Sequence, residues 1–296
     1  MIWTDYDTWI VVTAAAIAMA CALPGLFLFL NRDSMMGDAI SHGILPGLAI
    51  AFLISGTRDS WVMLFGAVCA GLLTMLITSL VRRYGQVESG ASLGVAFCFL
   101  FALGLVLIRT AADTVELDPD TVLYGAIETS VMDAGPVPSI TILSLAMLVM
   151  NAVLTVVFYK ELRLAIFDPA MASALGFNAE RIRQGLVVVT SVTTVVAFQS
   201  VGSILVIAML VVPAAVASML TPRLGPMLVY ALLTAAISAV GGYLASIYLV
   251  PPLSAALIGN GKPLATSAAG SIVVAAGAIF AAVLIAQAVY RRALRH

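Results

Sequence analysis

Charged residues are scarce in this chain. Asp, Glu, Lys and Arg make up 10% of its 296 residues, whereas hydrophobic residues make up 62%. The mean hydropathy is +1.12. A water-soluble domain of this size does not need so much apolar sequence, so the composition predicts an all-α, polytopic helical membrane protein embedded in a lipid bilayer. The formal net charge of −1 and the lack of a basic tract give no sign of a nucleic-acid partner.

Residue types that are missing exclude several chemistries. Histidine occurs only at His42 and His296, which leaves no Ser/His/Asp set for hydrolysis and too few imidazoles for haem or quinone carriers. No Gly-Lys-Ser/Thr phosphate loop is present, so we do not expect the chain itself to hydrolyse ATP. Cys21, Cys69 and Cys98 stand at unrelated spacings in apolar stretches, which is typical of packing residues rather than of disulfides or thiolate metal sites. We therefore expect no enzyme and no permanently bound cofactor.

Apolar segments bounded by charges, Pro and Gly divide the chain into about nine transmembrane helices, with eight to ten as the range. Each is close to the roughly 20 residues that a bilayer requires. We expect them to form a single transmembrane domain over 1–296, with two short spans meeting in a tight turn at 198–203. The predicted spans are 9–30, 34–55, 61–81, 91–108, 139–159, 183–199, 203–221, 225–249 and 268–290.

The distribution of Lys and Arg predicts the orientation, because cytoplasmic loops retain basic residues. With nine crossings and the N-terminus outside, only Arg58, Arg109 and Lys262 face outward. The other eleven of the 14 Lys and Arg residues then lie in the cytoplasm, as does the C-terminus.

The span at 34–55 carries two ionisable side chains well inside it, Asp38 and His42. Four residues apart on a helix, they share one face. Ionisable groups are costly inside a membrane, so the pair is a functional-site hypothesis by default, although a polar pair that stabilises the bundle is the alternative. Residues expected to let the helix bend where a path opens are Gly37, Gly43, Pro46 and Gly47.

Two loops are long enough to have structure of their own. The outer loop, about 109–138, contains six acidic residues, which suit either a negatively charged vestibule that attracts cations and meets an external partner, or a plain solvated loop. Their spacing does not match a calcium loop. The acidic residues are Asp113, Glu116, Asp118, Asp120, Glu128 and Asp133.

The inner loop, about 160–182, contains a predicted short cytoplasmic helix within 167–177. Asp168 suits the N-cap, Pro169 suits the first helical position, and Gly176 suits the C-terminal end. An apolar helix at the inner face must be covered. It either lies on lipid headgroups or docks in a groove of a cytoplasmic protein, and its residues alone leave both alternatives open.

Three motifs resemble the permease subunits of metal-ion ABC transporters, which import manganese, zinc or ferrous iron into bacteria. They are Gly-Asp-Ala-Ile-Ser-His-Gly-Ile-Leu-Pro-Gly at 37–47, Ala-x-x-Leu-Gly at 172–176, and the Val-Gly to Pro-Ala-Ala stretch at 201–215. Their order and spacing match over nearly the whole chain. The first motif is fairly specific to this family, whereas vitamin B12 and siderophore permeases share the other two. The run at 117–125 looks like the manganese-leaning branch.

The resemblance implies a role for specific residues and partners. Asp38 and His42 would hold a transported Mn²⁺, Zn²⁺ or Fe²⁺ at a dimer interface. The second motif would be a coupling helix seated in cytoplasmic ATP-binding subunits, which favours docking over lipid contact. The other implied partners are a second permease subunit, identical or paralogous, and an external metal-binding protein, all at the bacterial plasma membrane. The implied coupling residues are Asp168, Ala172, Leu175 and Gly176.

Two other transporter classes are alternatives to this hypothesis. In a proton-coupled secondary transporter, Asp38 and His42 would form a proton relay. Such a carrier needs no docking helix, and no inverted repeat is visible in the sequence. A permease for a larger chelate such as cobalamin would need a wide pathway, in which an intramembrane Asp–His pair would be superfluous.

Overall fold

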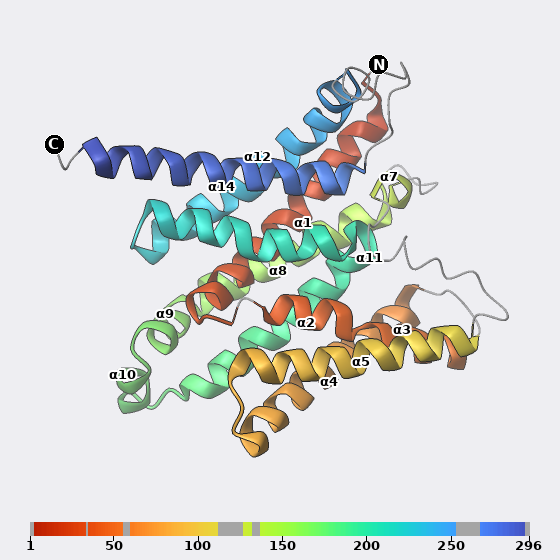
Figure 1. Ribbon diagram of the computed structural model, residues 1–296, viewed down its shortest axis with the longest axis vertical. Helices are drawn as coiled ribbons and strands as arrows, with labels where there is room; N and C mark the ends of the chain where they lie inside the picture. The colour runs from red at the N-terminus through yellow and green to blue at the C-terminus, as the bar shows by residue number, and fades with distance from the viewer. Residues whose placement is uncertain are drawn as a thin grey trace.

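The computed structural model describes residues 3–33, 35–55, 60–111, 127–131, 137–252 and 267–293, and the chain in these ranges is helical with no strand (Figure 1). This confirms the predicted all-α class. The helices are α1 (Asp5–Leu30), α2 (Met36–Gly43), α3 (Leu45–Ser55), α4 (Ser60–Gly85), α5 (Ser89–Ala111), α7 (Ile127–Ser130), α8 (Ser139–Val157), α9 (Tyr159–Phe167), α10 (Pro169–Ala174), α11 (Ala179–Leu220), α12 (Leu224–Tyr248) and α14 (Ala268–Ala293).

Eight segments within the described residues are long and apolar enough to cross a membrane. Six of them are the helices α1, α4, α5, α8, α12 and α14. The other two are the halves of α11, Ala179–Phe198 and Ser200–Leu220. Each of the eight corresponds to a predicted span. The ninth predicted span, 34–55, is not among them.

The segment at 34–55 contains two helices in succession, α2 and α3, and the residue between them, Ile44, keeps helical φ and ψ (−72° and −29°). Pro46 explains the division, because it has no amide hydrogen to offer the carbonyl of His42 four residues earlier. Proline is well tolerated in the first turn of a helix, which is its position in α3. At 1.5 Å per residue, α2 and α3 are only about 12 and 16 Å long.

The predicted turn at 198–203 is a reversal in the middle of α11. Gly202 has φ 76° and ψ 171°, a backbone conformation open to glycine. Leu186 lines a pocket with Phe27 of α1. Leu210 packs against the same part of α1, so closely that a Cβ at Gly25 would collide with its backbone. A straight helix would separate Leu186 from Leu210 by about 36 Å, so the two halves must run back alongside each other (Figure 1).

Helix α1 lies at the centre of the bundle and packs against α8, α11 and α12. Its buried face is rich in small residues, including Ala14, Ala18 and Ala22, which allow neighbouring helices to approach closely. Against them pack Leu205 and Met209 from the second half of α11. Close van der Waals contact, rather than exclusion of water, holds such helices together inside lipid.

Polar side chains on α8 satisfy a backbone defect in α1. Pro24 lies inside α1 and cannot donate to the carbonyl of Ala20. The Asn151 Nδ2 of α8 donates to that carbonyl at 2.9 Å and to Thr193 Oγ1 at 2.9 Å. An unsatisfied carbonyl is costly in hydrocarbon, so Asn151 lets α1 carry a proline without breaking.

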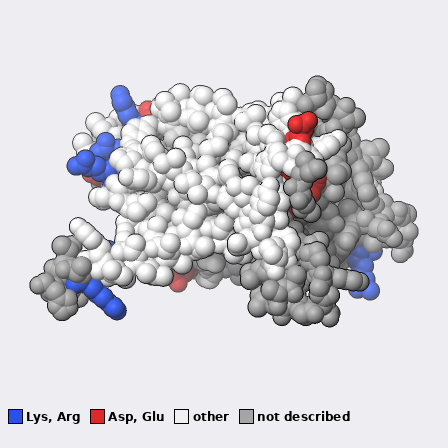
Figure 2. Space-filling model, turned by 90° about the horizontal axis from the view of Figure 1, so that it is seen from above, with Lys and Arg blue, Asp and Glu red and all other residues white. Residues whose placement is uncertain are grey.

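Charged side chains gather toward the two ends of the molecule, and the surface between them is largely uncharged (Figure 2). We call one end the basic end; it holds the ends of α1, α4 and α14, the α11–α12 turn and the segment α9–α10 (Figure 1). Among the described Lys and Arg residues, Arg109 alone belongs to the opposite end. This distribution of Lys and Arg is the one expected if the basic end lies in the cytoplasm. The orientation itself stays a prediction.

We expect Asn151→Ala to lower the free energy of unfolding by about 1 kcal/mol, since it leaves the Ala20 carbonyl without its donor. In a Pro24→Ala background the loss is smaller, because the new amide at position 24 can donate to Ala20. Thermal unfolding of the purified protein across the four members of this double-mutant cycle measures the difference. Equal losses in both backgrounds would contradict the role assigned to Asn151.

Candidate functional site

Helix α2 is held inside the bundle by close contacts with α4, α5 and α11. Added Cβ atoms at Gly37, Gly43 and Gly47 would collide with Leu210, Thr74 and the backbone of Gly66, respectively. These three glycines therefore allow close packing. Their predicted role in bending, together with that of Pro46 in the first turn of α3, stays a prediction.

His42 is half-buried and lies between two aromatic rings of α5. The centroid of its imidazole is 5.6 Å from that of Phe97 and 5.6 Å from that of Phe101, with an interplanar angle of 89° to the latter. Edge-to-face packing of this kind restricts the orientation of the ring. Asp38 belongs to α2 one turn before His42, and its side chain lies outside the described part of the structure. Their cooperation in holding a metal ion therefore stays a prediction.

One chain does not supply a full set of metal ligands among the side chains described. No three His, Cys, Asp or Glu residues come together there in a way that could hold a metal ion. Protein-bound zinc takes three or four protein ligands, and a pair such as Asp38 and His42 provides two. A metal site at α2 would need further ligands from another chain or from water.

The second candidate region is α10, which forms where the sequence predicted a short helix. The Asp168 Oδ1 accepts a hydrogen bond from the Met171 amide at 2.9 Å, so it is the predicted N-cap. Gly176 ends the helix with φ 86°. Its amide donates to the Ser173 carbonyl at 3.1 Å, and the Phe177 amide donates to the Ala172 carbonyl at 2.9 Å. This is the Schellman pattern, which uses glycine at the left-handed position.

Helix α10 and its flanks expose apolar side chains at the basic end. Ala172 is fully buried against the protein, whereas large apolar side chains around it are exposed. Contiguous exposed apolar surface marks an interaction site. We call this the α10 surface; it consists of Phe167, Met171, Leu175 and Phe177.

Helix α9 precedes α10 and was missed by the sequence analysis, which placed a loop there. Its signal is the pair Leu162 and Ile166, four residues apart, which face the hydrophobic core while Lys160 and Arg163 alternate with them. A short charged helix beside a long apolar span is easily mistaken for a loop.

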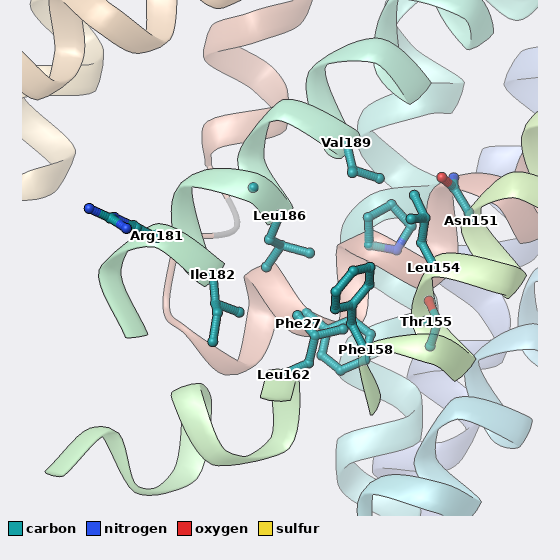
Figure 3. Close-up of a pocket in the computed structure, with 12 residues that line it drawn as sticks. Phe27, Asn151, Leu154, Thr155, Phe158, Leu162, Arg181, Ile182, Leu186 and Val189 are labelled. Atoms are coloured by element: carbon teal, nitrogen blue, oxygen red, sulfur yellow. The ribbon is translucent and has the colours of Figure 1, made fainter. Parts of the chain in front are cut away.

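A cavity of about 340 Å³ lies between α8, Leu162 of α9 and the first half of α11, and Pro24 and Phe27 of α1 also line it. Figure 3 shows its apolar lining, with Arg181 pointing away from the cavity. The Asn151 Oδ1 is buried without a hydrogen-bond partner among the described atoms. Leu162 of α9 belongs to the hydrophobic core, so this cavity lies beside packed contacts.

At the opposite end, Glu128 of α7 is the member of the acidic outer loop that the structure describes. Its Oε1 accepts a hydrogen bond from the Ala268 amide at 2.9 Å, which ties α7 to α14. The other five acidic residues of that loop lie outside the described residues. The negatively charged vestibule accordingly stays a prediction.

The sequence was compared with family models and curated proteins. Residues 5–260 match the model described as the ABC 3 transport family. The chain is 39% identical over 259 residues to the manganese transport system membrane protein MntD of Bacillus subtilis (strain 168), covering 86% of this chain and 88% of that protein. It is 38% identical over 209 residues to the zinc transport system membrane protein TroD of Treponema pallidum (strain Nichols), covering 69% of this chain and 57% of that protein.

A solved structure shares the fold. PsaBC from Streptococcus pneumoniae in complex with Fab matches with a TM-score of 0.75 and 26% sequence identity, covering 95% of this chain and 91% of that one. The family match spans most of the chain, and the relatives are similar along much of its length. The chain therefore belongs to the ABC 3 transport family, the family of metal-ion ABC permeases that its sequence motifs resemble.

Proposed function

We propose that this chain is the membrane-spanning permease subunit of an ATP-driven importer of Mn²⁺, Zn²⁺ or Fe²⁺. The observation that carries the proposal is an imidazole, His42, held between two aromatic rings on the short helix α2 inside a permease of this family. Relatives named for manganese and zinc transport support these cargoes. Fe²⁺ is added on chemical grounds, because carboxylate and imidazole ligands suit all three ions.

In the proposed site, Asp38 and His42 of two permease subunits face each other across a dimer interface. A second subunit, identical or paralogous, would bring the number of metal ligands to four. The described side chains of one chain do not provide that number. An external binding protein would deliver the ion to the end opposite the basic end. The ligands would replace part of the hydration shell that the ion loses on entering the membrane.

Cytoplasmic ATP-binding subunits are the proposed partners of the α10 surface. Burial of Met171 and Leu175 in a groove of such a subunit would remove exposed apolar area from water. In this proposal the basic end lies in the cytoplasm of a bacterium and the N-terminus lies outside. The Lys and Arg distribution agrees with this orientation. A secondary transporter driven by protons would have no use for the α10 surface.

We expect His42→Gln and Asp38→Asn each to reduce metal uptake by at least about tenfold, since metal sites lose 10–100-fold in affinity even when a supporting residue is changed. Uptake of radioactive Mn²⁺ or Zn²⁺ is measured in vesicles that contain the permease with its cognate ATP-binding subunit, with and without ATP.

Thr234→Val on α12 serves as the control, because it removes a buried hydroxyl bonded within its own helix and far along the chain from α2. Its uptake is expected to stay near that of the wild type. Normal uptake by both α2 variants would contradict the metal site. Uptake by the wild-type protein that needs a proton gradient and no ATP would overturn the proposed function.

Gly176→Val is expected to uncouple ATP hydrolysis from transport while leaving the complex assembled. A Cβ at φ 86° costs on the order of 1–2 kcal/mol in backbone strain, which α10 can relieve only by changing the shape of the surface it presents. The ratio of metal ions transported to ATP hydrolysed is the readout.

Gly94→Val on α5 is the matched control. Gly94 has open space around its Cα and no positive φ, so the same side chain is added there without strain. A transport ratio for Gly176→Val equal to that of Gly94→Val would argue against the docking role of α10.

A further inference from the structure

An ion pair joins the start of α11 to the turn between α1 and α2. The Arg183 Nη2 lies 3.1 Å from the Asp33 Oδ2, and the two side chains are 28% and 7% exposed, respectively. Partial burial shields the pair from solvent, so the interaction is stronger and more directional than an ion pair on an open surface. The sequence analysis assigned no role to either residue.

Asp33 is attached through its backbone to both α1 and α2. Its amide donates to the Leu28 carbonyl at 3.0 Å, and its carbonyl accepts from the Met36 amide at 3.0 Å. Arg32 beside it has φ 63°, a left-handed conformation that is unfavourable for a residue other than glycine. Hydrogen bonds on both sides of Asp33 thus join it to α1 and to α2, so a displacement of Asp33 is passed to the first residue of α2.

Arg183 is attached to α10 through a short and well-defined connection. Gly176 ends α10, and the Asn178 Oδ1 then caps α11 by accepting from the Arg181 amide at 3.1 Å. Arg183 lies in the second turn of that helix. Seven residues after Gly176, it follows any movement of α10 that tilts the start of α11.

Apolar side chains of these parts belong to one core cluster, and cavities remain beside it. A second cavity, of about 190 Å³, lies beside the one in Figure 3 and is lined by Asn31, Ile166, Pro169 and Arg183. Side chains that border a cavity can shift without moving their neighbours, whereas a short ion pair between two anchored residues transmits displacement. The ion pair is thus a directional contact between the start of α11 and the α1–α2 turn, in addition to the apolar packing of the core.

We propose that the Asp33–Arg183 ion pair transmits the movement of α10 to α2, and so changes the position of Asp38 and His42 during transport. This inference rests on the proposed function. Asp33 and Arg183 are positioning residues in it, since they act on the metal site through α2 and do not contact the ion. Asp33 is five residues, less than a turn and a half, from Asp38.

The test uses the complete complex in vesicles, with ATP hydrolysis and Mn²⁺ uptake measured on the same samples. Asp33→Asn and Arg183→Gln keep most of the side-chain shape and remove one charge. We expect the ratio of Mn²⁺ transported to ATP hydrolysed to fall at least about threefold in each, which is within the range by which residues between two sites alter their coupling. ATP hydrolysis itself is expected to stay within about twofold of the wild-type rate.

Arg181→Gln is the matched control, because Arg181 lies on the same helix and points away from the cavity (Figure 3). Its transport ratio is expected to equal that of the wild type. The charge swap Asp33→Arg with Arg183→Asp is expected to recover most of the ratio that the single variants lose. A purely structural pair would instead lower stability and both rates together, with the ratio unchanged.

An unchanged ratio in Asp33→Asn, or an equal fall in Arg181→Gln, would overturn the inference. If the single variants fail to assemble, Arg183→Lys decides, because it keeps the charge: a ratio near the wild-type value supports transmission and a threefold fall contradicts it. Failure of the proposed function looks different, since the wild-type complex itself would then transport none of Mn²⁺, Zn²⁺ and Fe²⁺ with ATP.

Discussion

The structure depends on one constraint, that a backbone carbonyl inside a bilayer must find a hydrogen-bond donor within the protein. Prolines in the spans bring this constraint to particular residues. At Pro24 the Asn151 amide of a neighbouring helix supplies the missing donor, and α1 continues as a single long helix through the centre of the bundle. At Pro46 the segment instead divides at Ile44 into α2 and α3. The same chemical defect therefore yields a rigid central helix in one place and two short helices in another.

The surroundings of α2 are what make a site possible there. The helix packs against α4, α5 and α11, and α3 follows it directly. Glycines at the contacts bring these helices close, and Phe97 and Phe101 of α5 close around His42. An imidazole in such surroundings is only partly exposed to water, and it lies on a short helix that is joined to the end of α1 through Asp33.

Local sequence signals predicted much of this architecture. The long apolar segments and the Lys and Arg residues between them predicted the spans, and the Asp168-Pro169 and Gly176 signals predicted α10 with its cap and its glycine end. The reversal at Gly202 also fell where two short spans were expected. The sequence does not predict the division at Ile44, because a proline near the start of an apolar segment can bend a helix as readily as divide it. Contacts between distant residues, such as Asn151 with Ala20 and Arg183 with Asp33, have no local signal at all.

Cavities lie beside close contacts in both candidate regions. Gly43 and Gly47 leave little room for a methyl group, and a cavity of about 880 Å³ lies between Met36, α4 and α11. Cavities of about 340 and 190 Å³ border the start of α11. Cavities lower the stability of a fold, since their lining atoms lose contacts. Regions with few buried contacts are also those that open and shift at low cost in free energy. The Asp33–Arg183 ion pair crosses this region, which is what the proposed transmission from α10 to α2 requires.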